Sequence, residues 1–495
     1  MTAYESLEAI RKRVSSLNNA LGILFWDQET MMPDGAATPR AEVVAELSLM
    51  VHELETDERL PDLLAAAEEQ CDQLCDWQRA NLREIRQLYV HANAMPADLV
   101  ERTVMARSES VMAWREARPS NDFNSLAPKL EALFDLKREE ATIKSEILGV
   151  TRYEAMLDQY DPGRREPQVD ALFDDLAAFL PGILPQVLEK QAREPAPEPP
   201  AGPFPLANQE VLSQEIMRVL DFPFERGRLD TAAHPFSGGA EGDVRITTRY
   251  EDDDFTKSLM AVVHETGHAL YEDGRPAAWR GQPVGDSRGM TLHESQSLLL
   301  EMQAARTEEF IRFLTPLAQR ALQGSGPAWT AENMLRLYRK VEPGLIRVYA
   351  DEVTYPLHVI LRYKLEKAII ANEIPIAELP GAWNEMMQQY LGITPPDNID
   401  GVMQDVHWPE GLFGYFPTYS LGALAAAQIF AAARSREPAI LPGLASGDFK
   451  PLYAWLDKNI RSQGCLHTPD ELIERATGSP LGTEAYKANI MARYL

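Results

Sequence analysis

The stretch VVHETGHALYED, residues 262–273, decides how the rest of the chain is interpreted. It sets His264 and His268 four positions apart in apolar surroundings, with Glu265 between them. On an α-helix, positions i and i+4 lie about 40° apart on one face, so both imidazoles can converge on one ion. Glu265 lies beside that ion without having to bind it. The pattern predicts a buried helix that holds a divalent metal, next to a carboxylate that acts as a base.

A catalytic metal of this kind needs a third protein ligand. The metzincin pattern is excluded, because it requires glycine at Tyr271 and histidine at Gly274. The ligand must therefore come from elsewhere, most simply from a second helix in the segment TLHESQSLLLEMQ, 291–303. Glu294 is the favoured candidate and Glu301, on the same helix face, is the alternative. The competing interpretation of the whole pattern is a pair of hydrogen-bonded core histidines.

Composition narrows the class of protein. The chain has 495 residues, 45% hydrophobic and 25% charged, with a formal net charge of −27. A surface this acidic argues against nucleic acid and anionic membranes as partners. Three cysteines are too few and odd in number for a disulfide scaffold, and the N-terminus lacks the apolar core of a signal peptide. We expect a cytoplasmic protein, in which the longest apolar run, 421–433, forms a buried helix.

Helical periodicity dominates the chain. Apolar residues recur at three- and four-residue spacing in four segments, namely 124–148, 168–192, 328–341 and 351–371. The clearest strand is DVRITTRY, 243–250, whose backbone groups we expect to be available to an extended peptide. The fold class is therefore mainly α with a small β element.

The segment EPAPEPPAGPFP, 194–205, is expected to be irregular because its prolines exclude a helix. The flanking sequence is helical on both sides, so we interpret this segment as a long loop within one domain, 1–495. The domain then has an N-terminal helical half, about 1–200, and a metal-site half, about 206–495. A linker between two domains is the alternative.

Further motifs stand in order along the chain. They are WDQETMMP (26–33), HPF (234–236), DVRIT (243–247), HESQ (293–296), IRVYAD (346–351), DNIDGVMQDVHW (397–408), GYFPTYSLG (414–422) and HTPDELIERATGSPL (467–481). Together with HETGH, this set resembles the motifs of the M32 metallocarboxypeptidases, the carboxypeptidase Taq family. The resemblance covers nearly the whole chain.

The resemblance implies a helical fold with a deep central groove, like that of the neurolysin and angiotensin-converting-enzyme peptidases, and usually a homodimer. It implies His264, His268 and Glu294 as metal ligands and Glu265 as the base. The metal is expected to be zinc, with cobalt possible. The implied activity is the removal of single residues from peptide C-termini with broad specificity. An endo-oligopeptidase of the same clan and a non-catalytic helical scaffold are the alternatives.

Removal of C-terminal residues needs a group that binds the free carboxylate, and a planar guanidinium suits this task. Arg347, which we place on a helix, is the first candidate; its alternative role is an ion pair with Asp351, four residues on. Arg245 is the second candidate, although a structural pair with Asp243 is equally consistent. We place His234 in the substrate pocket.

Hydrolysis passes through an oxyanion, which needs a hydrogen-bond donor beside the metal. Tyr415 and Tyr419, expected in a Gly- and Pro-containing loop, are candidates, and His407 is a further one. Packing is the alternative role for each tyrosine. Asp351 is expected to orient a site residue from behind, and His293 to be a hydrogen-bonding neighbour of the metal site rather than a ligand.

Overall fold

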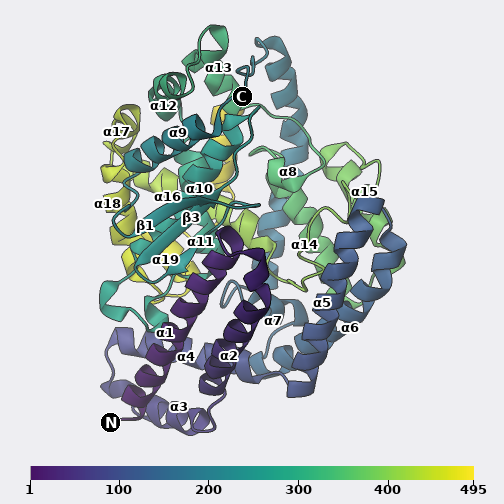
Figure 1. Cartoon of the computed structure of the whole chain (residues 1–495), viewed down its shortest axis with the longest axis vertical. Helices are drawn as coiled ribbons and strands as arrows, with labels where there is room; N and C mark the ends of the chain where they lie inside the picture. Colours follow the sequence, from purple (N-terminus) through teal and green to yellow (C-terminus); the bar gives the residue numbers. More distant parts are fainter. Residues whose placement is uncertain (1) are drawn as a thin grey trace.

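The computed structural model describes residues 2–495, and these residues are mainly helical (Figure 1). Helices α1 to α9 precede a small sheet, and α10 to α20 follow it. The elements are α1 Ala3–Thr30, α2 Ala37–Glu55, α3 Leu60–Glu69, α4 Asp76–Asn93, α5 Ala97–Ser120, α6 Phe123–Leu148, α7 Arg152–Leu157, α8 Glu166–Arg193, α9 Leu206–Val219, β1 Gly227–Thr231, β2 Ser237–Ala240, β3 Asp243–Thr248, α10 Phe255–Asp273, α11 Gly289–Leu298, α12 Glu308–Ala321, α13 Ala331–Tyr338, α14 Tyr355–Ala371, α15 Leu379–Leu391, α16 Pro417–Arg436, α17 Ile440–Ser446, α18 Lys450–Asn459, α19 Pro469–Thr477 and α20 Glu484–Tyr494. The predicted fold class, mainly α with a small β element, is confirmed.

The four helices expected from periodicity are present as α6, α8, α13 and α14. Two of them are shorter than predicted. Helix α13 begins only after Thr330, whose hydroxyl accepts a hydrogen bond from the backbone N–H of Asn333. Helix α14 begins at Tyr355, because Asp351 turns the chain just before it by accepting two backbone N–H bonds. A side-chain cap before α13 and an aspartate turn before α14 therefore set the two starts, and periodicity detects neither.

Helix α16 lies at the centre of the molecule, where it packs against α11, α14, α19 and α20. Fourteen of its residues are buried, many of them alanines that let neighbouring helices approach closely. The buried helix predicted at 421–433 is confirmed. In Figure 1 the α1–α2 hairpin, in purple, crosses the lower front of the molecule, and α5 and α6 run along its right side.

The sheet has the strand order β1-β3-β2, with β1 parallel and β2 antiparallel to β3. Val244 and Ile246 of β3 are buried against Val262 and Ala269 of α10, so the sheet covers one side of the helix that carries the HETGH motif. The expectation that the strand in 243–250 offers its backbone to a peptide is wrong. Both edges of β3 are already paired, which leaves the outer edges of β1 and β2.

Helix α8 has the length and composition to cross a membrane, the one such helix among residues 2–495. Its apolar side instead packs into the main core, where Phe173 and Leu180 are buried. On its polar side Asp170 accepts a 2.8 Å hydrogen bond from Lys367 of α14. The segment 194–205 after α8 is irregular, as predicted. A single domain divided into two halves there stays a prediction.

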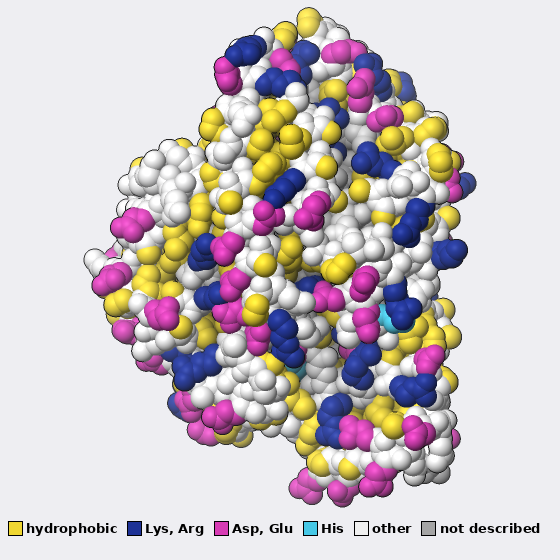
Figure 2. Space-filling view, turned by 180° about the vertical axis from the view of Figure 1, so that it is seen from behind, with side chains coloured by type: hydrophobic (Ala, Val, Ile, Leu, Met, Phe, Trp, Pro, Cys, Tyr) yellow, Lys and Arg dark blue, Asp and Glu magenta, His cyan; other side chains and the backbone are white. Residues whose placement is uncertain are grey.

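The surface carries charges of both signs. On the face in Figure 2, Lys and Arg side chains stand singly or in pairs among Asp, Glu and hydrophobic side chains. On this face the basic side chains therefore do not join into one patch.

Candidate active site

Three helices cross at the HETGH motif, and two glycines make the crossing possible. A Cβ on Gly267 of α10 would lie 2.6 Å from the backbone oxygen of Gln296 in α11. A Cβ on Gly422 of α16 would lie 2.8 Å from Cγ of Glu294. Real Cβ atoms do not tolerate such contacts, so glycine is required at both positions. The close approach brings Glu294 of α11 against the two histidines of α10.

His264, His268 and Glu294, which we call the metal cluster, face one another. Nε2 of His268 lies 3.3 Å and Nε2 of His264 3.8 Å from the same carboxylate oxygen of Glu294. The three potential ligand atoms all lie within 4.8 Å of one another. Two imidazole nitrogens and one carboxylate oxygen are a donor set that suits a divalent transition metal, with room for a fourth position. The residues of the metal cluster therefore fit the metal that the sequence motif requires.

Glu301 is not part of this cluster. It lies in the π-helical turn Leu299–Ala304 that continues α11, and its carboxylate accepts a 2.9 Å hydrogen bond from Nδ1 of His264. Its other oxygen accepts a 3.0 Å bond from Arg306. A hydrogen bond at Nδ1 fixes the plane of the ring and turns Nε2 towards Glu294. Between the two candidates, the geometry assigns Glu294 to the cluster and places Glu301 behind His264.

Burial and neighbouring charges shift the pKa values of the residues in and beside the metal cluster. Burial raises the pKa of Glu265 to about 7, although His264 opposes the shift. Burial by itself would lower the pKa of His264, but the carboxylates of Glu294 and Glu301 outweigh it and raise that pKa to about 10. The His264 side chain nevertheless keeps 21% of its surface exposed. The cluster can therefore be reached from solvent. Together with the neighbouring Glu265 and Glu301, it contains more carboxylates than protonated histidines.

His293 packs directly against the metal cluster. Its ring is stacked on that of His268, with centroids 4.5 Å apart, and its Nε2 lies 3.0 Å from the carboxylate of Glu272. Because that contact turns Nε2 away, His293 supports the ring of His268 from the side. Its position agrees with the expectation of a hydrogen-bonding neighbour rather than a ligand.

A second group of charges, Arg347, Arg362 and Asp405, forms what we call the arginine cluster. Arg347 donates hydrogen bonds of 3.1 and 3.4 Å to Asp405, and its guanidinium lies against the rings of Phe416 and Tyr419. Arg362 is fully buried beneath it, 3.9 Å from the same aspartate. The guanidinium of Arg347 is therefore held on one edge and on its faces.

Two expectations about Arg347 are wrong. It lies in the single 3-10 turn Arg347–Tyr349 rather than on a helix, so an i,i+4 pair with Asp351 does not form. Its partner is Asp405, from a segment 58 residues further along. Asp351 caps the start of α14 and contacts neither cluster among the described residues, so its expected role behind the site is also wrong.

Tyr415, Tyr419 and His407 lie together between the two clusters. The hydroxyl of Tyr419 is 3.4 Å from Nε2 of His407, and the two tyrosine rings meet edge to face. Burial raises the pKa of both tyrosines, and Glu294 adds to each shift. Burial also lowers the pKa of His407 to about 3. All three groups are therefore neutral at physiological pH. Tyr419 belongs to α16 and not to a loop, which corrects the predicted setting.

His234 and Arg245 lie apart from these groups. His234 is exposed on the connection between β1 and β2, where its backbone oxygen accepts a 3.4 Å bond from Thr247. Arg245 forms a bidentate pair with Asp243 and lies 5.9 Å above the ring of Trp26. The structural interpretation of the Asp243–Arg245 pair is thus the one the contacts favour. The structure does not bring either residue into the metal or arginine cluster.

Two residues of the site, Asp405 and Tyr355, were not predicted from the sequence. Asp405, the partner of Arg347, stands two positions before His407 in the quoted DNIDGVMQDVHW stretch. Its position close to His407 in that motif is the sequence signal that could have identified Asp405 as a site residue. Tyr355 is buried at the first turn of α14, and the carboxylate of Glu294 and the guanidinium of Arg347 both act on its pKa, which burial raises. Charges of both clusters thus act on Tyr355, although the sequence around it contains no motif.

Comparison with known proteins identifies the family and the fold. The family model for carboxypeptidase Taq (M32) metallopeptidases matches residues 6–494. The chain is 37% identical to thermostable carboxypeptidase 1 of Thermus thermophilus, over 99% of this chain and 98% of that one. Among solved structures, metallocarboxypeptidase 1 of Trypanosoma cruzi matches with a TM-score of 0.97 and 40% identity, over 99% of both chains. The M32 carboxypeptidase of Deinococcus radiodurans matches with a TM-score of 0.92 and 34% identity, over 99% and 98%. The chain belongs to the M32, or carboxypeptidase Taq, family and is a metallocarboxypeptidase.

Proposed function

We propose that this metallocarboxypeptidase uses zinc to release single residues from the free C-termini of peptides, with broad specificity. The convergence of His264, His268 and Glu294 supports this proposal. Arg347, which Asp405 holds against the ring of Tyr419, supplies a guanidinium for the C-terminal carboxylate. Zinc bound by the two histidines and Glu294 would polarise the scissile carbonyl and lower the pKa of water. Cobalt is a second candidate for the same donor set.

Glu265 is the proposed base. It is the buried residue next to His264, and its pKa of about 7 suits a group that must accept a proton from water and later return it to the leaving amine. His264 and Glu294 both act on that pKa, which supports a role for Glu265 beside the metal cluster. An adjacent acid that is not itself a ligand can transfer protons without leaving its position.

Tyr415 and Tyr419 are the proposed donors to the oxyanion, with His407 behind them. Both hydroxyls stay protonated at neutral pH because burial raises their pKa. Glu265 and Glu294 both act on the pKa of Tyr415, whereas Arg347 acts most strongly among the charges on Tyr419. We therefore prefer Tyr415 as the donor to the oxyanion.

Arg347 is the residue that we propose to bind the C-terminal carboxylate of the substrate. Asp405 engages its Nε and Nη2, while Phe416 and Tyr419 cover its faces. Nη1 is the guanidinium nitrogen that Asp405 does not engage, and we assign it to the C-terminal carboxylate of the peptide. Its distance from the metal cluster across the tyrosines would select the last peptide bond. Arg245 and His234 are then left to contact residues further along the peptide.

We also propose a cytoplasmic homodimer without nucleic acid or membrane partners. The net charge of −27 and the three unpaired cysteines support a soluble protein of a reducing compartment. An exposed hydrophobic stripe on α5 supports a protein partner, with Val104 and Met105 exposed by 60% and 59%. Light scattering of the purified protein, compared with its V104D variant, tests the dimer.

The decisive experiment compares a peptide with a free C-terminus and the same peptide as the amide. With zinc present, we expect amino acids to be released one at a time from the free acid, while the amide stays intact. A chelator should stop the reaction, and zinc should restore it. Internal cleavage of the amide would instead identify an endo-oligopeptidase. Zinc binding without hydrolysis of any peptide would identify a scaffold. Peptides that differ only in the last residue then test the breadth of specificity.

A further inference from the structure

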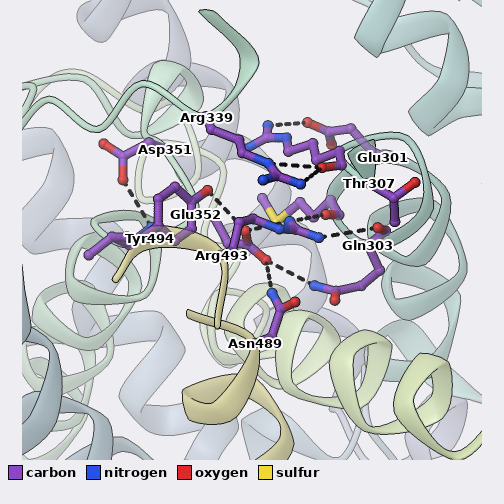
Figure 3. A network of polar contacts seen from close by, with 12 residues as sticks. Glu301, Gln303, Thr307, Arg339, Asp351, Glu352, Asn489, Arg493 and Tyr494 are labelled. Atoms are coloured by element: carbon purple, nitrogen blue, oxygen red, sulfur yellow. Dashed lines mark hydrogen bonds and ion pairs between the residues drawn. The ribbon is translucent and has the colours of Figure 1, made fainter. Parts of the chain in front are cut away.

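A buried polar network connects the C-terminal helix α20 to the core of the molecule (Figure 3). At its centre the Glu352 side chain is 0% exposed. Each carboxylate oxygen accepts two hydrogen bonds. Gln303 and Asn489 donate to one oxygen, at 2.9 and 2.8 Å, and Arg493 and Tyr494 donate to the other, at 2.7 and 3.1 Å. A buried carboxylate with all of these partners is well ordered, since losing any one leaves the charge under-solvated.

Arg493 also binds the π-helical turn Leu299–Ala304. Its Nη1 donates to the backbone oxygen of Met302 at 2.6 Å, and its Nη2 to that of Gln303 at 3.2 Å. Carbonyls at the end of a helical turn lack partners within the helix and are costly to bury unpaired. Arg493, with 6% of its side chain exposed, supplies these partners inside the protein. The last turn of the chain therefore caps the π turn.

The same π turn carries Glu301. The widened turn closes with the N–H of Ala305 on the oxygen of Leu300, five residues back. Within it Glu301 accepts the 2.9 Å bond from Nδ1 of His264 and the 3.0 Å bond from Arg306. The backbone oxygen of Arg306 in turn accepts two bonds from Arg339, at 2.9 and 3.2 Å. π turns are rare and concentrate at functional sites. Here the turn carries a residue, Glu301, that contacts the proposed metal ligand His264 directly.

We propose that Arg493, through its capping of the π turn, is a positioning residue for the metal cluster. It holds the turn in the conformation that aims Glu301 at His264, and Glu352 holds Arg493. The C-terminal helix thus sets the orientation of one zinc ligand without approaching the metal. The inference rests on the proposed function only in taking His264 as a ligand.

Zinc affinity and the absorption spectrum of bound cobalt test this proposal, because both respond to ligand orientation rather than to turnover. The variant is E352Q/R493M, which removes both charges together so that neither is left buried alone. The matched control is K487M. Lys487 lies on α20, as Arg493 does, but it forms an ion pair with Asp175 of α8, away from the π turn. E301Q is the positive reference. Folding of each metal-free variant is checked by circular dichroism, and zinc affinity by competition with a chromophoric chelator.

We expect E301Q to bind zinc between 10- and 100-fold more weakly, because a neutral amide replaces the carboxylate behind a metal-ligating histidine, and changes to such partners generally have this effect. E352Q/R493M should weaken zinc binding by roughly tenfold and alter the cobalt spectrum in the same direction. K487M should leave both unchanged. A folded E352Q/R493M protein with parental zinc affinity and cobalt spectrum would overturn the proposal.

Should E352Q/R493M fail to fold, R493K decides in the same assays, because a lysine can pair with Glu352 but cannot cap two carbonyls in Arg493's geometry. A reduced zinc affinity then supports the proposal, and an unchanged one overturns it. Failure of the proposed function would look different. The parent protein would then bind zinc but hydrolyse no peptide, whatever residue 493 is.

Discussion

The metal cluster and the arginine cluster are both buried groups of charge, but they are balanced differently. In the first, the carboxylates of Glu265, Glu294 and Glu301 surround two histidines, and within the described residues Arg306 is the guanidinium paired with them. In the second, two arginines, Arg347 and Arg362, face Asp405 and the buried Glu366. Acids are in excess at one site, and charges are matched at the other.

The difference indicates what each cluster is built to accept. Buried charge without a partner is costly, so an excess of carboxylates is best relieved by a cation. The metal cluster is therefore complete only with its ion. In the arginine cluster opposite charges are paired without any ligand, so Asp405 keeps the guanidinium of Arg347 in place before substrate arrives. Preorganisation of this kind reduces the entropy lost when a peptide binds. Substitutions in the two clusters should accordingly affect different steps.

The largest effect is expected at Glu265. In E265Q the amide cannot accept a proton, so kcat should fall by about a thousandfold, while zinc is still bound by His264, His268 and Glu294. Peptide hydrolysis and the zinc content after dialysis are measured on the same preparation. E272Q is the matched control, since it changes an acid on the same helix that contacts His293 instead of the metal cluster. Normal turnover by E265Q would exclude Glu265 as the base.

In the arginine cluster, R347M should reduce kcat/KM for peptides with a free C-terminus by a few hundredfold, mainly through KM, because a buried charge contact to the carboxylate is lost. D405N should give a smaller loss of about tenfold, because Arg347 remains but loses its anchor. Zinc affinity should stay unchanged in both variants. If R347M instead lowered kcat at unchanged KM, the two clusters would not divide binding from chemistry as the comparison proposes.

The tyrosines between the clusters should separate the two roles more finely. Y415F should lower kcat by about a hundredfold, as loss of one oxyanion donor does. Y419F should act chiefly on KM, because the Tyr419 ring lies against Arg347 and its hydroxyl meets His407. Steady-state kinetics with one free-acid peptide distinguish the two patterns. The opposite assignment, with the kcat effect in Y419F, would move the oxyanion donor to α16.

The metal cluster was predictable from sequence because its geometry is local. Positions i and i+4 of α10 fix His264 and His268, and one neighbouring helix supplies Glu294. The arginine cluster was only half predictable. The rule that offered Asp351 as an alternative partner of Arg347 holds on a helix, but the chain there forms a 3-10 turn, and tertiary packing brings Asp405 from a distant segment.

The same limit applies to the other corrections. Alternation in 243–250 predicted a strand, but whether its edges are free depends on β1 and β2, which pair with it through the fold. The role of Glu301 depended on a widened turn that shifts its carboxylate behind His264, and no composition signal marks such a turn. Local periodicity thus gave the elements and the two histidines of the metal cluster, whereas long-range pairing decided the partners.

The smallest predicted effect concerns the proton on His264. In the metal-free protein its pKa is raised to about 10, that of His268 is lowered to about 4, and that of Glu294 is lowered to about 2. At pH 8 only His264 must therefore lose a proton before its imidazole can bind zinc. Calorimetric titrations with zinc in two buffers of different ionisation enthalpy should show the release of about one proton.

The sign of this effect follows from the raised pKa. Protonated His264 stabilises the metal-free fold fully below pH about 6.5, and this stabilisation is lost as the pH rises towards 10, whereas zinc affinity increases over the same range. E301Q removes one of the three carboxylates that raise the pKa, so its proton release at pH 8 should be smaller than that of the parent. If the parent releases no proton at pH 8, His264 is already neutral, and the excess of negative charge that distinguishes the metal cluster from the arginine cluster is weaker than the contacts imply.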